Sequence, residues 1–502
     1  MFVLTADEIR DVEKKCFASY YSEADLMLKA GTGCFNEIVK RYSGSIVNST
    51  VSVLCGNGKN AGDGFVIARL LYAYGADVKI VICDKEPVIE EPLMYYNQAI
   101  SSGVDVVPFS KECLNADFVV DTMFGIGFHG EARAPFDRIF ELLCDYKGEI
   151  ISVDTPSGTN STTGEVCKSC VKADFTIAVS TLKYAHILPP ASSYCGDTAV
   201  IDIGIPDDCY DGGYINTIDF QQVKNIFPKR DKNANKGTFG TLLNLCGSYA
   251  MPGAAVICTK SALKTGAGLV KLTLPKSAYP LAASHLVQNI FHPVSENDNG
   301  TFSAQSAQEI LDDIETADCV AAGCGMGCND DTKAVVDSLL KNSKAPVILD
   351  ADGINCISDH INILKDINVP VVLTPHPGEM ARLLSSSVSD IQSNRINIAK
   401  KFAEEYGVVL VLKGANTIVT DGNEVFVNLN GNPGMAMGGA GDMLSGMIGS
   451  FVAQGISPFD AAKAAVFIHG RCGDITAKSL SMRSMTVCDM LNTLGTLMSE
   501  FE

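Results

Sequence analysis

Two patterns of apolar and polar positions follow one another along the chain and predict an α/β protein. Residues 5–42 carry apolar residues at helical spacing, and Thr5 and Glu8 form the Thr-x-x-Glu pattern that starts a helix. Further on, short apolar runs such as 51–55 and 78–83 end in glycine or polar residues and precede helical segments. Strands that alternate with helices in this way are typical of parallel sheets covered by helices.

In the first half, three predicted strands end beside glycine and polar residues. A glycine-rich loop over residues 56–64 follows the first of them and leads to a helix over residues 65–74. A single aspartate at such a strand end is more often a turn or cap residue than a functional one. Because the carboxyl ends of parallel strands line one crevice, however, four polar residues are expected to converge there: Asn60, Asp121, Asp154 and Ser157.

The first of these loops also allows a different interpretation. Gly56-Asn-Gly-Lys-Asn-Ala61 satisfies the dinucleotide-binding fingerprint with alanine in third place, and Asp84 follows the next strand where a ribose-binding acid would be expected. A redox enzyme is therefore one alternative, and an ordinary tight turn between strand and helix is another.

Residues 230–502 repeat the unit of strand, glycine or polar loop, and helix. Each apolar run ends in small or polar residues, which is the layout of an open α/β sheet with its site along one edge. The loops at the strand ends are residues 247–255, 323–327, 350–353, 374–379 and 413–417.

Several side chains in this half allow both a functional and a structural interpretation. Lys413 either faces phosphates or is a solvated strand end. His376 lies between two prolines, where a structural turn residue is commoner than a catalytic one. Asp350 and Asp352 flank one residue and are expected to point to opposite faces, one toward a ligand or metal and one as a cap. His469 is expected to pack within a helix.

The densest glycine segment, residues 430–446, is the centre of the second half. Gly438, Gly439 and Gly441 precede a helical apolar pattern, so the free N–H groups of that helix's first turn would face an anion such as phosphate. Asp442 is either a helix cap or a base that takes a proton from a hydroxyl attacking the phosphate. The glycine density favours the second role, because a cap requires none of it.

Composition narrows the class of protein. The 502 residues are enough for two or more domains, and 46% hydrophobic and 19% charged residues are ordinary for globular proteins. The net charge of −19 argues against nucleic-acid or anionic-membrane partners, and no apolar run reaches membrane-spanning length. Eighteen cysteines without a signal-peptide pattern indicate a reducing cytoplasm. Neither zinc binding nor redox chemistry is expected of the most closely spaced ones, Cys167, Cys170, Cys324 and Cys328.

The first half carries a helical leader and three motifs, Gly56-Asn-Gly-Lys-Asn-Ala-Gly-Asp-Gly64, Asp121-Thr-Met-Phe-Gly-Ile-Gly127 and Asp154-Thr-Pro-Ser-Gly158. Together they resemble the NAD(P)H-hydrate epimerase family over residues 1–220. The resemblance implies a Rossmann-like fold without a redox cofactor, acting on NADH or NADPH that carries water across a nicotinamide double bond. It implies Asp154 as catalytic acid or base.

The same resemblance implies two sets of ligand-binding residues. A potassium ion would be bound by Asn60, Asp121 and Ser157, whose oxygens suit a hard cation. The family usually has Asn-Asn-Gly-Gly-Asp where this chain has Lys59-Asn-Ala-Gly-Asp63. The hydrate would be held by Lys59, Asn60, Ala61, Gly62, Asp63, Gly125, Ile126, Gly127, Phe128, His129, Gly130 and Glu131, together with Asp154.

The second half carries an ordered series of motifs, among them Lys236-Gly-Thr-Phe-Gly240, Gly323-Cys-Gly-Met-Gly327, Thr374-Pro-His-Pro-Gly-Glu379, Gly438-Gly-Ala-Gly-Asp442 and His469-Gly-Arg471. The series resembles the ADP/ATP-dependent NAD(P)H-hydrate dehydratase family, which has a ribokinase-like fold. The family usually has Ser at Ala440 and Thr at Met437. The resemblance implies that the hydrate contacts Ala255, Gly325, His376 and Asp442. It implies that the nucleotide contacts Lys413, Gly414, Ala415, Asn416, Thr417 and Gly441.

The two resemblances predict a two-domain α/β enzyme, with a Rossmann-like three-layer domain over residues 1–220 and a ribokinase-like three-layer α/β/α domain over residues 228–502. The first domain would interconvert the R and S hydrates of NADH and NADPH, and the second would dehydrate the S form with ADP, giving AMP and phosphate. Potassium, magnesium and ADP or ATP are the implied ions and co-substrate, and a cytoplasmic homo-oligomer is expected. The alternatives are a vitamin-precursor kinase with a fused nucleotide-binding domain, and a nucleotide-binding module without turnover.

Overall fold

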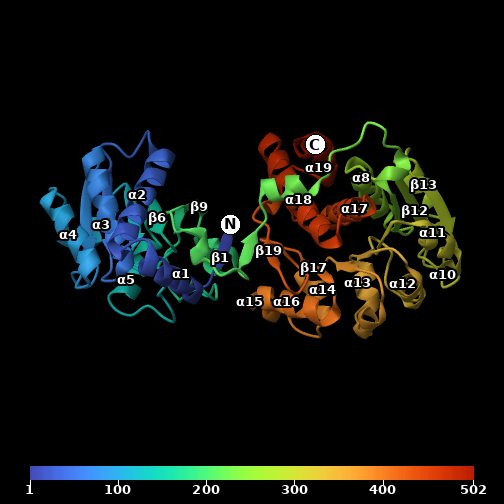
Figure 1. Ribbon diagram of the computed structural model, residues 1–502, viewed down its shortest axis with the longest axis horizontal. Coiled ribbons are helices and arrows are strands. Elements are labelled where there is room, and N and C mark those ends of the chain that lie inside the picture. Colours follow the sequence, from blue (N-terminus) through green and yellow to red (C-terminus); the bar gives the residue numbers. More distant parts are fainter. The chain divides into compact units, whose positions relative to one another are not determined.

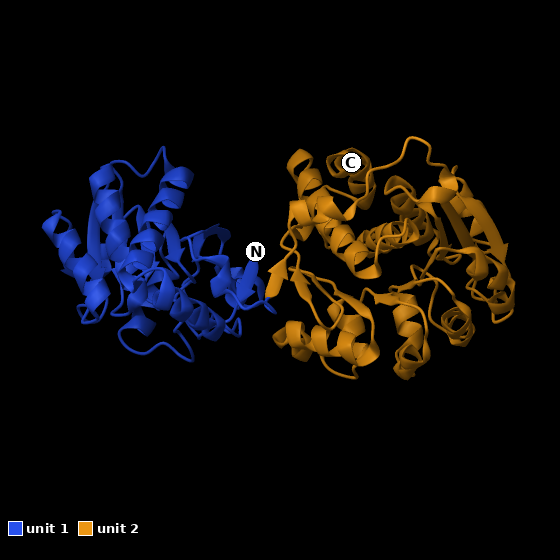
Figure 2. Cartoon of the chain, viewed as in Figure 1, with its two compact units in different colours: residues 1–214 blue, residues 215–502 orange.

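The computed structural model describes residues 1–502 and divides into two compact units, residues 1–214 and 215–502 (Figure 2). The expected first domain ran to residue 220. Strand β10 (Ile215–Thr217) lies in the second unit because it pairs in parallel with β19 (Val425–Val427). None of the helices combines the length and the apolar character that a membrane-spanning helix requires.

The first unit begins with the predicted helical leader. Helices α1 (Ala6–Ser19) and α2 (Glu23–Tyr42) both start with capping boxes, in which Thr5 and Ser22 accept hydrogen bonds from the backbone N–H groups of Glu8 and Asp25. Two short strands, β1 (Phe2–Leu4) and β8 (Leu182–Lys183), pair in parallel.

A parallel sheet forms the centre of the first unit, with strand order β4-β3-β2-β5-β6-β7-β9. The alternation of side chains places Val53 among residues of α1 to α4 and the adjacent Leu54 among residues of α5, so helices cover both faces. Its strands are β2 (Thr50–Cys55), β3 (Asp77–Ile82), β4 (Asp105–Pro108), β5 (Phe118–Thr122), β6 (Glu149–Val153), β7 (Phe175–Val179) and β9 (Asp197–Ile201). Its further helices are α3 (Lys59–Tyr74), α4 (Glu90–Ser101), α5 (Phe136–Leu143) and α6 (Tyr184–Ile187).

The start of α3 corrects the predicted loop over residues 56–64, because the helix begins at Lys59 and not at residue 65. The glycines that suggested a loop instead permit close packing within the helix. A Cβ atom at Gly62 would lie 2.2 Å from Met27 Sδ, and one at Gly64 would lie 2.3 Å from Thr122 Oγ1. These glycines therefore let α3 approach α2 and the sheet.

The second unit is built on a sheet with strand order β13-β12-β11-β14-β15-β16-β17-β18-β19-β10. It is parallel from β13 to β17, and the hairpin β18–β19 adds antiparallel pairs at one side. Its strands are β11 (Thr241–Leu245), β12 (Leu269–Pro275), β13 (Ile290–Val294), β14 (Cys319–Ala322), β15 (Val347–Leu349), β16 (Val371–Leu373), β17 (Val409–Leu412) and β18 (Ile418–Thr420), with β19 and β10 as given above.

Helix α17 (Ala440–Ala453) is the most buried helix of the second unit and packs against α8 (Pro252–Lys264) and α18 (Pro458–Ser479) (Figure 1). It starts at Ala440 within the glycine segment, so Gly438 and Gly439 precede the helix as predicted, whereas Gly441 already lies in its first turn. The remaining helices are α7 (Phe220–Ile226), α9 (Tyr279–Ala283), α10 (Ser306–Glu309), α11 (Leu311–Thr316), α12 (Asp330–Asn342), α13 (Asp352–Ile357), α14 (Pro377–Leu383), α15 (Val388–Ser393), α16 (Arg395–Tyr406) and α19 (Val487–Leu497).

Candidate active sites

A cavity of about 480 Å³ opens at the carboxyl ends of the strands in the first unit. The leader helices contribute to its wall through residues such as Glu13 and Met27. Most of the residues expected to hold a ligand line it, namely Lys59, Asn60, Asp63, Gly125, Ile126, Gly127, Phe128 and Asp154.

Five other residues expected in this site lie elsewhere. Ala61 is fully buried and Gly62 faces Met27, because α3 already begins at Lys59 and turns these two positions toward α2. His129 and Gly130 are exposed outside the cavity lining, and Glu131 accepts a hydrogen bond from the backbone N–H of Lys168 at 2.9 Å.

Asp154 is paired with a buried lysine that the sequence analysis missed. Lys183 Nζ lies 2.5 Å from Asp154 Oδ1, and the two residues are only 1% and 8% exposed. The ammonium group also donates to the carbonyls of Val179 and Thr181 at 2.6 and 3.0 Å. Asp154 has a φ of +69°, a strained conformation for a residue other than glycine.

A histidine behind this pair fixes its geometry. His186 Nδ1 accepts from the backbone N–H of Lys183, and Nε2 lies 2.8 Å from the Asp154 carbonyl, so Nε2 carries the proton. Burial and the nearby Lys183 charge lower the pKa of His186 to about 4, which keeps the ring neutral. His186 is therefore a positioning residue for both members of the pair.

Two further carboxyl groups, those of Glu13 and Asp63, lie close enough to Lys183 to feel its charge. Burial, and then repulsion by Asp154, raise the pKa of Glu13 above its usual value and that of Asp63 well above it. Both residues line the cavity. The site therefore contains protonatable carboxyl groups around one buried cation, which is the arrangement that acid–base chemistry needs.

Asn60, Asp121 and Ser157 meet around the turn at residues 123–125, as predicted. Asn60 Nδ2 donates to the carbonyls of Phe124 and Val153, and Ser157 Oγ donates to Asp121 Oδ1 at 2.6 Å. Asp121 is fully buried without a cationic partner, and burial raises its pKa although hydrogen bonds oppose the shift. Asn60, Asp121 and Ser157 carry oxygen ligands of the kind that a hard monovalent cation prefers, and such a cation would offset the buried Asp121 charge.

In the second unit, Lys413 is held behind the start of α17. Its Nζ lies 2.6 Å from Asp350 Oδ1 and 3.9 Å from Glu379 Oε2, and Ser445 Oγ donates to the other Asp350 oxygen at 2.6 Å. Burial acts to raise the pKa of Asp350, but the Lys413 charge and the hydrogen bonds outweigh it and hold this pKa below its usual value. A Cβ atom at Gly441 would lie 3.2 Å from Lys413 Nζ, so glycine gives the lysine room.

Asp442 lies in the first turn of α17 beside this ion pair. Burial, and then the Asp350 charge, raise the pKa of Asp442 to about 6. The oxygens of Asp442 and Asp350 and the Cys324 sulfur all lie within 4.8 Å of one another. A carboxylate with a pKa close to neutrality, at the N-terminus of a glycine-preceded helix, is suited to take a proton from a hydroxyl.

Three other residues that were expected to contact the hydrate are Ala255, Gly325 and His376. Ala255 and Gly325 are buried, and a Cβ atom at Gly325 would lie 2.8 Å from Ala254 Cβ. His376 is the N-cap of α14, where its ring Nδ1 accepts from the backbone N–H of Gly378 at 2.9 Å. This capping role agrees with the structural interpretation of His376, although the ring itself is half-exposed.

The loop over residues 413–417 wraps around a buried arginine that the sequence did not reveal. The Arg395 guanidinium donates to the carbonyls of Leu412, Lys413 and Ala415 at 3.3, 3.1 and 2.7 Å. Gly414 adopts a φ of +127° over it, while Gly414 and Ala415 are exposed. Arg395 thus orders the backbone of this loop from below.

Asp352 takes the structural one of the two roles left open for Asp350 and Asp352, and His469 packs within a helix as expected. Asp352 Oδ2 accepts from the backbone N–H of Gly327 at 2.8 Å, and Ala351, with a φ of +47°, turns it away from Asp350. His469 is buried in α18, and burial lowers its pKa to about 4.

Comparison with known proteins finds a matching family for each of the two units. A family model described as NAD(P)H-hydrate dehydratase matches residues 242–495, and one described as YjeF-related protein N-terminus matches residues 23–185. The bifunctional NAD(P)H-hydrate repair enzyme of Moorella thermoacetica is 31% identical over 100% of this chain and 97% of its own length. This chain belongs to the bifunctional NAD(P)H-hydrate repair enzyme family.

Further similar proteins support the assignment of this chain to the repair enzyme family. The Escherichia coli repair enzyme is 31% identical over 94% of this chain and 88% of its own length. An ADP/ATP-dependent NAD(P)H-hydrate dehydratase from Bacillus subtilis, co-crystallised with ATP and Mg²⁺, is 29% identical and covers 57% of this chain and 99% of its own, with a TM-score of 0.51. A ribokinase-like superfamily protein from Enterococcus faecalis shares the fold, with a TM-score of 0.52 at 23% identity over 58% of this chain and 98% of its own. The predicted family and fold class are confirmed.

Proposed function

We propose that this chain repairs hydrated NADH and NADPH in two steps, one in each unit. The first unit interconverts the R and S hydrates, and the second dehydrates the S hydrate with ADP, giving NADH or NADPH, AMP and phosphate. The observation that carries the proposal is one acid–base site per unit, the Lys183–Asp154 pair in the first and Asp442 beside Lys413 in the second. The family membership of the whole chain supports the same assignment.

In the first unit, epimerisation requires the hydroxyl-bearing carbon of the hydrate to be inverted. The ring nitrogen can expel the hydroxyl once that group is protonated, and water can then return to the opposite face. Asp154 lies in the wall of the cavity and is placed to give and take these protons, while Lys183 stabilises its charged form. The apolar part of the cavity wall would exclude bulk water during the exchange.

In the second unit, the S hydrate hydroxyl would attack the terminal phosphate of the nucleotide. Asp442 removes the hydroxyl proton, and the free N–H groups at the start of α17 stabilise the transferring phosphoryl group. The ring nitrogen then expels the phosphate, and loss of a proton from the adjacent ring carbon to solvent restores the double bond of the reduced nicotinamide. Lys413 adds positive charge, and the exposed loop at 414–415 is open to the adenine nucleotide.

Two ions complete the proposal. Potassium would be held by Asn60, Asp121 and Ser157, where it would offset the buried Asp121 charge and fix the turn that lines the cavity. Magnesium would enter with the nucleotide, whose phosphate oxygens are its main ligands, and would neutralise charge on the transferring group. We also propose that the enzyme is a cytoplasmic homo-oligomer. Sedimentation of the purified protein would test its oligomeric state.

The decisive experiment incubates mixed hydrate epimers with ADP or ATP and Mg²⁺ and follows the return of the reduced-nicotinamide absorbance. Asp442→Asn should abolish dehydration and leave epimerisation intact, and Asp154→Asn should do the reverse. An unchanged dehydration rate in Asp442→Asn would contradict the assigned base. A stable phosphorylated product without reduced nicotinamide would mean that the second unit is a small-molecule kinase.

A further inference from the structure

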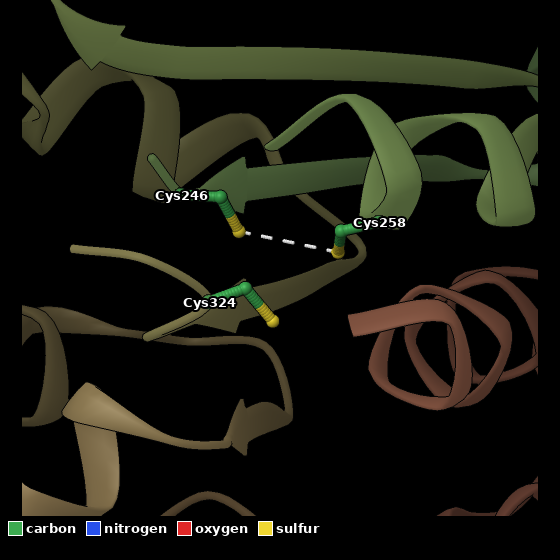
Figure 3. Close-up of side chains that lie close together, drawn as sticks. All are labelled: Cys246, Cys258 and Cys324. Carbon is green, nitrogen blue, oxygen red and sulfur yellow. Dashed lines mark hydrogen bonds between the residues drawn. The ribbon is translucent and has the colours of Figure 1, made fainter. Parts of the chain in front are cut away.

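Three cysteine thiols of the second unit lie together behind the proposed dehydratase site (Figure 3). Cys246 follows β11, Cys258 lies in α8, and Cys324 lies in the loop after β14. All three are at most 1% exposed, and their sulfur atoms lie within 4.8 Å of one another. The residues are far apart in sequence, so no spacing motif announces them.

The spacing of the thiols suits a tetrahedral metal ion. Zinc–thiolate bonds of about 2.3 Å place the sulfur atoms of a tetrahedral site about 3.8 Å apart. The sulfur atoms of Cys246 and Cys258 are 3.9 Å apart and are joined by a dashed line in Figure 3. A cation could therefore bind here with little movement of the chain.

Cys324 connects the thiol group to the two carboxylates of the proposed dehydratase site, Asp350 and Asp442. Its sulfur lies 3.9 Å from Asp350 Oδ2 and belongs to a second close set with Asp350 and Asp442. Asp350 is already committed to Lys413 and Ser445. Asp442 is part-exposed and already lies next to Cys324 in that second set, so it is the oxygen ligand that a metal bound to Cys324 would take.

We propose that Cys246, Cys258 and Cys324 form a site for one thiophilic divalent cation, such as Zn²⁺, with the Asp442 carboxylate as fourth ligand. The cation displaces the three thiol protons to solvent as the three metal–sulfur bonds form. It also withdraws Asp442 from the hydrate hydroxyl, so binding inhibits dehydration. The inhibition rests on the proposed function, whereas the binding site does not. Zinc binding at Cys324 would reverse the expectation that this cysteine binds no zinc.

The free thiols are protonated, so both oxidation and metal binding require their protons to be lost. Hydrogen bonds among the three thiols, together with burial, leave the pKa of each well above its usual value. Neutral buried thiols react slowly with oxidants, because the thiolate is the nucleophile. A cation that enters past Asp442 would replace the protons directly.

The binding test uses the full chain under a phosphine reductant, with Co²⁺ as a probe, because tetrahedral Co²⁺–thiolate complexes absorb strongly. Wild type and Cys319→Ala, a matched buried cysteine outside the group, should give this absorption at one equivalent. Cys246→Ala and Cys258→Ala should lose it and bind Zn²⁺ at least tenfold more weakly in competition with a chromophoric chelator. Equal absorption in all four proteins, or none in wild type, would overturn the site.

Two further measurements keep the result clear if a variant folds poorly. X-ray absorption of the wild-type zinc complex should show three sulfur ligands, and a shell of only nitrogen and oxygen would refute the assignment. One equivalent of Zn²⁺ in excess Mg²⁺ should slow dehydration at least tenfold in wild type but not in Cys258→Ala, and undiminished wild-type turnover would refute the inhibition. If the metal-free wild type fails to dehydrate the hydrate at all, the proposed function fails, while the spectra still decide the site.

Discussion

At the scale of single residues, Asp442 should set the pH dependence of dehydration. Its pKa is raised to about 6, first by burial and then by Asp350, and only the carboxylate can accept the hydroxyl proton. The rate should therefore be constant above this pKa and fall as the pH drops below it, by about tenfold for each further pH unit. Initial rates with saturating ADP and S hydrate would measure the profile.

A variant separates this base from other titrating groups. Asp442→Glu keeps a carboxylate but moves it along the side chain, so the midpoint of the profile should shift while the shape remains. A rate that is flat from acid to neutral pH in wild type would exclude Asp442 as the base.

The Lys183–Asp154 pair predicts a stability effect as well as a catalytic one. Lys183→Met leaves the Asp154 carboxylate buried without its partner, which should cost the first unit roughly 3 kcal/mol in free energy of unfolding. Epimerisation should be lost while dehydration by the second unit continues. Denaturant unfolding and the two activity assays would measure both effects.

The matched control is Lys172→Met, which removes an exposed lysine of the same unit and should change neither quantity. The double variant Asp154→Asn with Lys183→Met should recover part of the lost stability, because no unpaired charge remains buried. A Lys183→Met protein as stable as wild type would show that the pair contributes little to folding.

At the scale of elements, helix α16 should control nucleotide binding through Arg395. Arg395→Met removes the donors to three carbonyls of the loop at 412–415, so that loop should become mobile. We expect the KM for ADP to rise at least tenfold with the KM for the hydrate unchanged. Steady-state kinetics with each substrate varied in turn would test this.

Arg395→Lys should give an intermediate KM for ADP, because lysine keeps the charge but lacks the planar fork that reaches several carbonyls. Lys401→Met, on the exposed side of the same helix, is the control and should behave as wild type. A rise in the KM for the hydrate alone would place the loop against the other substrate.

Strand ends, and a helix start such as that of α1, could be predicted from the sequence, because they depend on local pattern. The glycine segment before α17 and the convergence of Asn60, Asp121 and Ser157 follow from apolar periodicity and the parallel-sheet rule. The predicted start of α3 was wrong. In sequence, a glycine that allows close contact between helices looks the same as a glycine that forms a loop. Lys183 and Arg395 were missed because their partners are set by tertiary packing, although each is a cation within an otherwise apolar or helical stretch.

At the scale of the whole molecule, each unit has its own core. The buried clusters of the first unit lie within residues 4–209 and those of the second within residues 218–501. Each of the two ion pairs in the proposed sites is held by groups of its own unit, such as His186 for Asp154 and Ser445 for Asp350. The side chains that hold each site therefore belong to the unit that contains it.

Because each site is built within its own unit, two full-length variants, each with one inactive unit, should complement each other when they are mixed. Asp154→Asn should dehydrate only the S hydrate, and Asp442→Asn should dehydrate neither epimer, because each change removes one acid–base group and leaves the other unit folded. A mixture of the two variants should repair pure R hydrate with ADP, since the S hydrate formed by one protein can diffuse to the other. The absorbance of reduced nicotinamide would record it, with each variant alone as the control for spontaneous epimerisation. Repair by the mixture no faster than by Asp154→Asn alone would mean that the S hydrate does not pass between molecules.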